Sequence, residues 1–240
     1  MNEHIQKIFT SRAVETPTGK KIPLHSAVAK NEGTHLLDLV KKDPSIQKTL
    51  EVGCAYGVSS LFIAEGLKDR SNAHHTIIDP FQNSHWEGVG VHNLKQSGFE
   101  RFDLIEEKSE FALPSVLKNG EGRFDLVFID GWHTFDHTLL DCFYAIRLLR
   151  VGGYLVVDDA DFPAIRRVID YLLLYPCFQF ESAASKKPKR WSKERWVQSL
   201  LRLVPSASNK RVPPRSLQSM VALKKTAVDN RSWNWFERDF

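Results

Sequence analysis

Short apolar runs alternate with longer segments of helical periodicity along most of this 240-residue chain. The apolar runs predict strands at 48–52, 75–79, 102–106, 124–129 and 154–158. Between and after them, the periodicity predicts helices at 58–68, 88–97, 110–118, 135–149 and 162–174. The run at 124–129 is nearly all apolar, which is typical of a strand buried on both faces of a sheet.

The same pattern extends to both ends of this core. A helix is predicted at 26–42, and two final strands are predicted at 177–182 and 218–224. Strands that alternate with helices predict an α/β fold, in which a mostly parallel sheet carries helices on both faces. Residues 1–25 show little periodicity and contain Pro17 and Pro23, so we expect an extended N-terminal lead-in. The rest, 26–240, is expected to form one domain.

The segment 184–216 is too long for an ordinary connection between two strands, and we interpret it as a basic amphipathic insertion. Within it, the window 185–215 has ten basic residues against Glu194 alone, so it carries +9 and leaves −5 for the rest of the chain, whose net charge is +4. Trp191, Trp196 and Leu200 favour an amphipathic helix over a plain surface loop. Such a helix could close over an active site, contact a second subunit in a homo-oligomer, or lie on an anionic membrane surface. Nucleic acid is a disfavoured partner, because no base-reading motif accompanies the charge.

Composition indicates a cytoplasmic protein. No apolar run approaches the roughly 20 residues that a membrane span needs, and the first residues lack the apolar region of a signal peptide. Cys54, Cys142 and Cys177 have neither paired nor metal-ligand spacing, which is typical of buried thiols in a reducing compartment.

Acidic residues and glycines gather where the predicted strands end. Glu51, Gly53 and Gly57 surround the end of the first core strand, Asp79 ends the second, and Asp130 and the pair Asp158-Asp159 end the last two. In an open parallel sheet these ends lie at one edge, where ligands bind. Carboxylates crowded at one edge are costly unless something compensates them, such as ribose hydroxyls, an amine or a divalent cation.

These motifs resemble those of class I S-adenosylmethionine-dependent methyltransferases over residues 26–224. The segment Phe128-Ile-Asp-Gly-Trp-His133 is similar to the branch that includes macrolide-sugar O-methyltransferases and, more distantly, metal-dependent catechol-type enzymes. The first-strand motif of the superfamily, acidic-x-Gly-x-Gly-x-Gly, reads Glu51 to Gly57 here with Ala55 at the middle glycine. The resemblance implies a Rossmann-like, doubly wound, seven-stranded sheet and S-adenosylmethionine as cofactor.

The resemblance also implies cofactor contacts for particular residues. The backbone of Gly53 and Gly57 would lie under the methionine part, with Glu51 near its ammonium group and Asp130 at the same edge. Asp79 would accept hydrogen bonds from the ribose, and Ser109 is our choice for the adenine contact. Two alternatives stay open: the glycines could simply form a tight turn, and Glu51 could be a buried residue that caps the following helix.

Asp130, Asp158 and Asp159 form a candidate metal triad, because three hard oxygen ligands near one point suit Mg²⁺. The alternative is that Asp158 caps a helix and Asp130 forms a turn with Gly131. His133 follows Asp130 by three residues and is the candidate general base.

Together these residues predict a Mg²⁺-dependent O-methyltransferase that acts on a small molecule. A sugar or polyketide-sugar hydroxyl is the preferred acceptor, and a phenol is the second. The alternatives are a metal-independent methyltransferase acting on nitrogen or RNA, and a catalytically silent protein that binds the cofactor and a partner.

Overall fold

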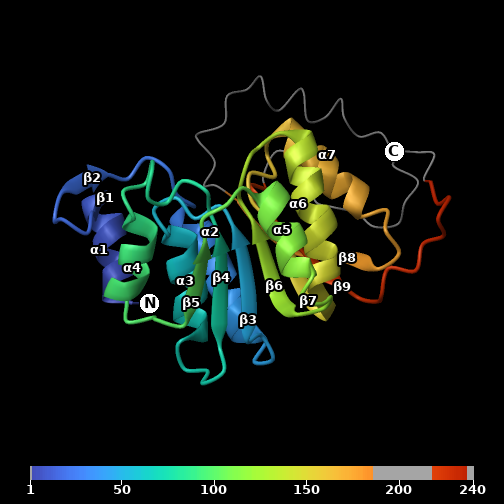
Figure 1. Cartoon of the computed structure of the whole chain (residues 1–240), viewed down its shortest axis with the longest axis horizontal. Helices are drawn as coiled ribbons and strands as arrows, with labels where there is room; N and C mark the ends of the chain where they lie inside the picture. The colour runs from blue at the N-terminus through green and yellow to red at the C-terminus, as the bar shows by residue number, and fades with distance from the viewer. Residues whose placement is uncertain (1, 186–217, 237–240) are drawn as a thin grey trace.

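We describe residues 2–185 and 218–236 of a computed structural model of the chain. A seven-stranded sheet with the strand order β5-β4-β3-β6-β7-β9-β8 forms its centre (Figure 1). Its strands are β3 Lys48–Val52, β4 His74–Ile78, β5 Phe102–Ile105, β6 Phe124–Ile129, β7 Leu149–Val157, β8 Phe178–Ala184 and β9 Met220–Lys225. The first five of these pair in parallel, and β9 lies antiparallel between β7 and β8. The α/β, doubly wound and mostly parallel fold is confirmed.

Helices cover both faces of this sheet (Figure 1). They are α1 Glu3–Ser11, α2 Lys30–Lys42, α3 Val58–Leu67, α4 Val89–Gln96, α5 Ser109–Leu117, α6 Phe135–Leu148 and α7 Pro163–Leu172. Successive residues of a strand point to opposite faces of the sheet and belong to two different core clusters. Leu126 and Phe128 pack with residues of α1 to α4, whereas Val127 and Ile129 pack with residues of α5 to α7. Burial on both faces explains why β6 is apolar at nearly every position.

The expectation of an extended lead-in is wrong. Asn2 caps α1 by accepting a hydrogen bond from the His4 amide, and Ile5 and Ile8 of α1 are buried. A short antiparallel hairpin follows, formed by β1 Ala13–Glu15 and β2 Lys21–Pro23. Ile5, Ile8 and Val14 belong to the same core cluster as the residues of α2 and α3, so the segment packs onto the domain.

Two element boundaries differ from the prediction by four residues or more. Helix α2 begins at Lys30 and not at residue 26, because the Glu32 carboxylate accepts a hydrogen bond from the Ala29 amide at 2.6 Å and fixes the start there. Strand β7 begins at Leu149, before Gly152 and Gly153, whereas the sequence predicts a strand only from residue 154. Gly152 passes through the strand with φ +84°, next to a shift in the register between β6 and β7.

The direction of chain progression reverses between β3 and β6, which are adjacent and parallel in the sheet. From β3 the chain moves outward to β4 and β5, and from β6 it moves the other way to β7. In folds of this kind the ligand crevice lies at such a reversal, beyond the carboxyl ends of the strands.

No helix in the ranges 2–185 and 218–236 is long and apolar enough to cross a membrane. Residues 186–216 of the predicted basic insertion lie outside those ranges, and its first residue, Ala184, ends β8.

Candidate active site

The turn after β3 lies directly against the end of β6. Gly53 has φ +87°, and a Cβ added to it would overlap the backbone carbonyl oxygen of Asp130. Gly57 has φ +74°, and a Cβ there would lie 2.8 Å from the backbone of Gly90 in α4. Both glycines are therefore required by close backbone approach and by left-handed conformation. Ala55 also has a positive φ, of 47°, in place of the glycine that the methyltransferase motif has there.

The Glu51 carboxylate lies beneath this turn and is fully buried. It accepts hydrogen bonds from the hydroxyls of Ser59 and Ser60 in α3 and lies 2.9 Å from Nε2 of His75. These contacts match the alternative in which Glu51 anchors the following helix. A contact with the cofactor ammonium group stays a prediction.

Asp79 holds the other side of the turn. Its carboxylate accepts hydrogen bonds from the amides of Cys54 and Ala55 at 2.9 and 2.8 Å, and from the Gln82 side chain and the Phe81 amide. Three of these donors contact Oδ2, and the Phe81 amide alone contacts Oδ1, so Oδ1 can accept a further hydrogen bond. In this structure Asp79 fixes the turn, and its contact with a ribose stays a prediction.

Three side chains converge at the ends of β6 and β7. Nε2 of His133 lies 3.2 Å from Oδ1 of Asp130 and 3.4 Å from Oδ2 of Asp159. One ligand atom from each of the three lies within 4.8 Å of the others, an arrangement that could hold a metal ion. Asp158, which the sequence predicted as a third ligand, is not one of these three side chains, and its role as a ligand stays a prediction.

Asp158 lies behind the cluster in a buried position. Its pKa is raised by burial, with further contributions from the negative charges of Asp130, Glu32 and Asp159. Its Oδ1 atom is buried and has no hydrogen-bond partner within the described part of the chain. A buried carboxylate oxygen without a partner is costly, and a divalent cation bound between Asp130 and Asp159 would lower that cost. Oxygen-rich donors of this kind fit Mg²⁺.

Backbone geometry directs Asp159 toward the cluster. This residue has φ +50°, which non-glycine residues rarely adopt, and its carbonyl accepts a hydrogen bond from the Phe162 amide at 2.8 Å. Strain of this sort, at roughly 1–3 kcal/mol, is found most often at functional sites.

Ser109 begins α5, where its side chain forms a hydrogen bond with the carboxyl of Asp141. Asp141 is buried in α6, and burial raises its pKa to about 6. The proposed adenine contact of Ser109 stays a prediction, since the hydroxyl already has a partner.

Because the pKa of Asp141 is raised in the folded protein, the stability of the protein should depend on pH. The folded protein binds a proton that the unfolded chain releases between about pH 4 and 6, so stability falls as the pH rises through this range. Above pH 7, Asp141→Asn should raise the free energy of unfolding by about 1–3 kcal/mol and remove this slope. Urea unfolding at pH 5 and pH 8 measures both. Asp69→Asn is the control, since Asp69 is exposed. Equal stability of Asp141→Asn and wild type at pH 8 would contradict the assignment.

Two aromatic residues of this edge were not singled out from the sequence. Trp132 lies between Gly131 and His133 and is 63% exposed, and Phe162 is 43% exposed with its ring edge-on to the His133 imidazole at 5.7 Å. Both are large apolar residues in loops that follow strands. Such residues do not belong to the pattern of core positions, and this could have marked them in the sequence.

Comparison with known proteins supports the same class of enzyme. Residues 50–160, which run from β3 through the candidate metal cluster, match a family model described as a methyltransferase domain. The match covers a little under half of the chain and agrees with the resemblance to class I S-adenosylmethionine-dependent methyltransferases. The turn after β3 and the acidic residues at the ends of β3, β4, β6 and β7 all fall within the matched range.

Curated relatives of the methyltransferase domain are O-methyltransferases. The chain is 29% identical over 141 residues to catechol O-methyltransferase B of Danio rerio, which covers 57% of this chain and 51% of that protein. It is 24% identical over 149 residues to a probable caffeoyl-CoA O-methyltransferase 1 of Dictyostelium discoideum, covering 59% and 60% of the two chains. The chain thus matches little more than half the length of these relatives.

Solved structures share the fold of the methyltransferase domain. An O-methyltransferase from Bacillus cereus in complex with SAH aligns with a TM-score of 0.65 at 15% identity, over 94% of this chain and 92% of that one. TomG from Streptomyces achromogenes, in complex with SAM, aligns with a TM-score of 0.61 at 18% identity, over 84% and 82% of the two chains.

Proposed function

We propose that this protein is a Mg²⁺-dependent O-methyltransferase that transfers the methyl group of S-adenosylmethionine to a hydroxyl of a small molecule. The contact between Gly53 and the backbone of Asp130 carries the proposal. It places the candidate cofactor turn beside the cluster of Asp130, His133 and Asp159. A methyl donor over the turn and an acceptor at the cluster would therefore be neighbours, and positioning of this kind supplies much of the rate gain in group transfer.

Each residue of the cluster has a distinct role in this proposal. Asp130 and Asp159 would hold the cation, with Asp158 available behind them. When bound, Mg²⁺ lowers the pKa of a hydroxyl that binds to it. His133, which faces the same point, would take the proton from the acceptor hydroxyl as the oxygen attacks the methyl group.

A phenolic acceptor is favoured over the sugar that the sequence analysis preferred. Phe162 is 43% exposed and lies edge-on to the His133 ring, so it offers aromatic surface beside the proposed base. Aromatic rings pack well in edge-to-face and offset arrangements, so a planar acceptor suits this edge. The relatives named for catechol and caffeoyl-CoA support the same class.

Calorimetric titration with S-adenosylhomocysteine tests the cofactor half of the proposal. We expect a Kd of about 1–10 μM for the wild-type protein. If the exposed Trp132 ring stacks on the adenine, Trp132→Ala should weaken binding by about 1–3 kcal/mol. Phe143→Ala is the matched control, because Phe143 is an exposed aromatic residue of α6 that packs against Arg147.

Wild-type protein that binds no S-adenosylhomocysteine at millimolar concentration would contradict the proposed function. Normal binding by Trp132→Ala would contradict only the stacking role and leave the function intact.

A further inference from the structure

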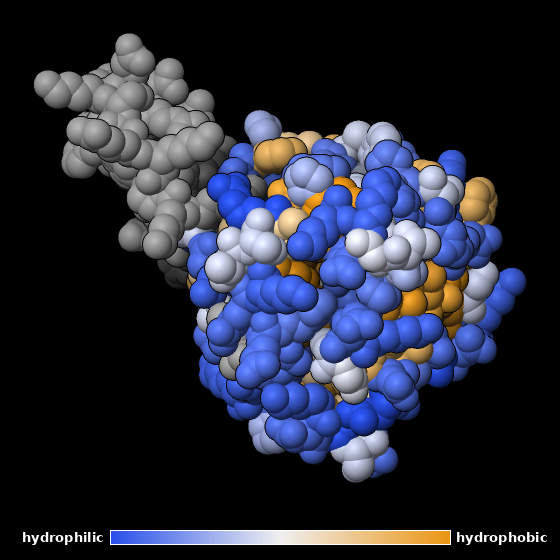
Figure 2. All heavy atoms as spheres, turned by 90° about the vertical axis from the view of Figure 1, so that its left-hand side faces the viewer, coloured by the Kyte–Doolittle hydropathy of each residue, from blue (hydrophilic) through white to orange (hydrophobic). Residues whose placement is uncertain are grey.

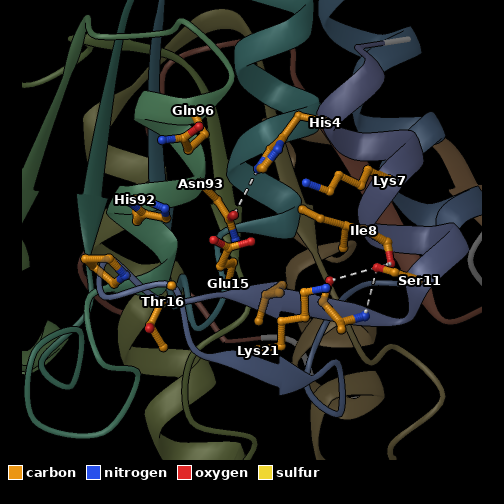
Figure 3. A pocket seen from close by; sticks show the side chains of 14 residues that line it. His4, Lys7, Ile8, Ser11, Glu15, Thr16, Lys21, His92, Asn93 and Gln96 are labelled. Atoms are coloured by element: carbon orange, nitrogen blue, oxygen red, sulfur yellow. Dashed lines mark hydrogen bonds between the residues drawn. The ribbon is translucent and has the colours of Figure 1, made fainter.

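A separate cavity of about 350 Å³ lies between α1, the β1–β2 hairpin and α4 (Figure 3). Its volume falls within the range of roughly 300–1,000 Å³ that is common for small-molecule sites. Neither the glycine turn nor the carboxylate cluster contributes a residue to its lining. The side of the molecule that carries these elements is mainly hydrophilic (Figure 2).

The charged groups of the cavity wall are mainly cationic. Lys7 of α1 and Lys21 of β2 line it together with one acidic residue, Glu15. In the ranges 2–185 and 218–236, neither lysine ammonium forms an ion pair with a carboxylate. Glu15 lies opposite Lys21 in the β1–β2 pair, but in the described part of the chain no carboxylate lies within ion-pair distance of either ammonium group. Two such lysines at one cavity are suited to bind an anion, and phosphate is a common ligand for lysine.

Hydrogen bonds between α1, α4 and the turn after β3 hold several polar groups of the wall in place. Nε2 of His4 lies 2.9 Å from Oδ1 of Asn93, which is buried and donates a hydrogen bond from Nδ2 to the carbonyl of Tyr56 at 2.9 Å. Asn2 donates to the Ser97 carbonyl at 3.2 Å, which ties α1 to the end of α4. Figure 3 shows His4 reaching from α1 toward Asn93. This part of the wall is therefore fixed before any ligand arrives, whereas Lys7, Glu15 and Lys21 are exposed at the mouth of the cavity.

We propose that this cavity binds a small phosphorylated polyol, such as a sugar phosphate, at a site separate from the cofactor and acceptor positions. Lys7 and Lys21 would bind the phosphate group. Glu15 would accept hydrogen bonds from ligand hydroxyls, and His92 and Gln96 of α4 offer further polar groups on the opposite wall. The wall connects through Asn93 to the turn that follows β3.

Glucose 6-phosphate is a suitable probe for calorimetric titration of the full chain. The titration contains EDTA and saturating S-adenosylhomocysteine, so that neither a metal nor the cofactor position contributes to phosphate binding. We expect a Kd of about 1 mM or tighter at low ionic strength. The double variant Lys7→Ala/Lys21→Ala should weaken binding at least about tenfold, because it removes both cations that face the phosphate.

The control is Lys95→Ala/Lys118→Ala, which removes the same charge from two exposed lysines that do not line the cavity. It should bind glucose 6-phosphate as the wild-type protein does. Glucose without the phosphate should bind at least tenfold more weakly. Absence of binding at about 10 mM probe, or equal losses in the two double variants, would overturn the proposal. Asp159→Asn should leave this binding unchanged, so failure here is distinguishable from failure of the proposed methyl transfer.

Discussion

Replacing His133 with alanine is expected to lower the rate of methyl transfer by about 10²- to 10⁴-fold while the affinity for S-adenosylhomocysteine stays near that of the wild-type protein. The reason is position. Nε2 of His133 lies 3.2 Å from Asp130 and 3.4 Å from Asp159, so the ring faces the point where a hydroxyl would be held. A radiolabelled methyl-transfer assay with a catechol acceptor measures the rate. His137→Ala is the control, because the His137 ring forms a hydrogen bond with the Thr134 side chain at the exposed start of α6 and is not part of the cluster.

The same variant separates two roles that the geometry allows for His133. If the imidazole is the base, the Mg²⁺ concentration that gives half-maximal rate should not change, and high pH should partly restore the rate because hydroxide can take the proton. If the imidazole is a metal ligand, that Mg²⁺ concentration should rise instead. Wild-type turnover in His133→Ala would show that neither role is correct.

Asp159→Asn is expected to remove at least about 99% of the activity and to leave the fold intact. Loss of a ligand should exceed the 10- to 100-fold effects that are typical of groups that only support a ligand. The backbone of Asp159 has φ +50°, and asparagine tolerates this conformation as well as aspartate does, so the change removes charge without new backbone strain. Asp136→Asn, at the exposed start of α6, is the control. An Asp159→Asn variant with full activity would exclude this residue from the metal centre.

Much of the fold could be predicted from the sequence because its signals are local. The strands 48–52 and 124–129 are apolar runs that end in turn residues, and the structure has β3 and β6 at the same positions. The first 25 residues were misjudged although a short local signal is present, because Ile5, Ile8 and Phe9 are spaced as on one helix face and Asn2 can cap the helix. Spacing alone does not show that Ile5 and Ile8 join a core cluster with residues of α3 and α4.

The candidate site was predictable in its location and less so in its contacts. Acidic residues at the ends of parallel strands had to meet at one edge, and Asp130 and Asp159 do meet there. However, no sequence pattern shows that Asp79 accepts hydrogen bonds from the amides of Cys54 and Ala55. Nor does any pattern show that Glu51 forms a hydrogen bond with His75 on the neighbouring strand. Spacing along the chain likewise does not reveal that His133 lies close to Asp130 and Asp159, or that Asp159 has a positive φ.

The rate of methyl transfer from S-adenosylmethionine to a catechol, measured with added Mg²⁺ and with EDTA, tests the central claim most directly. The proposed centre of Asp130 and Asp159 predicts full activity with Mg²⁺, loss of at least about 99% of it with EDTA, and recovery when Mg²⁺ is restored. S-adenosylhomocysteine should bind equally well under both conditions. Equal rates with Mg²⁺ and with EDTA would contradict the metal-dependent mechanism and leave these aspartates with a structural role.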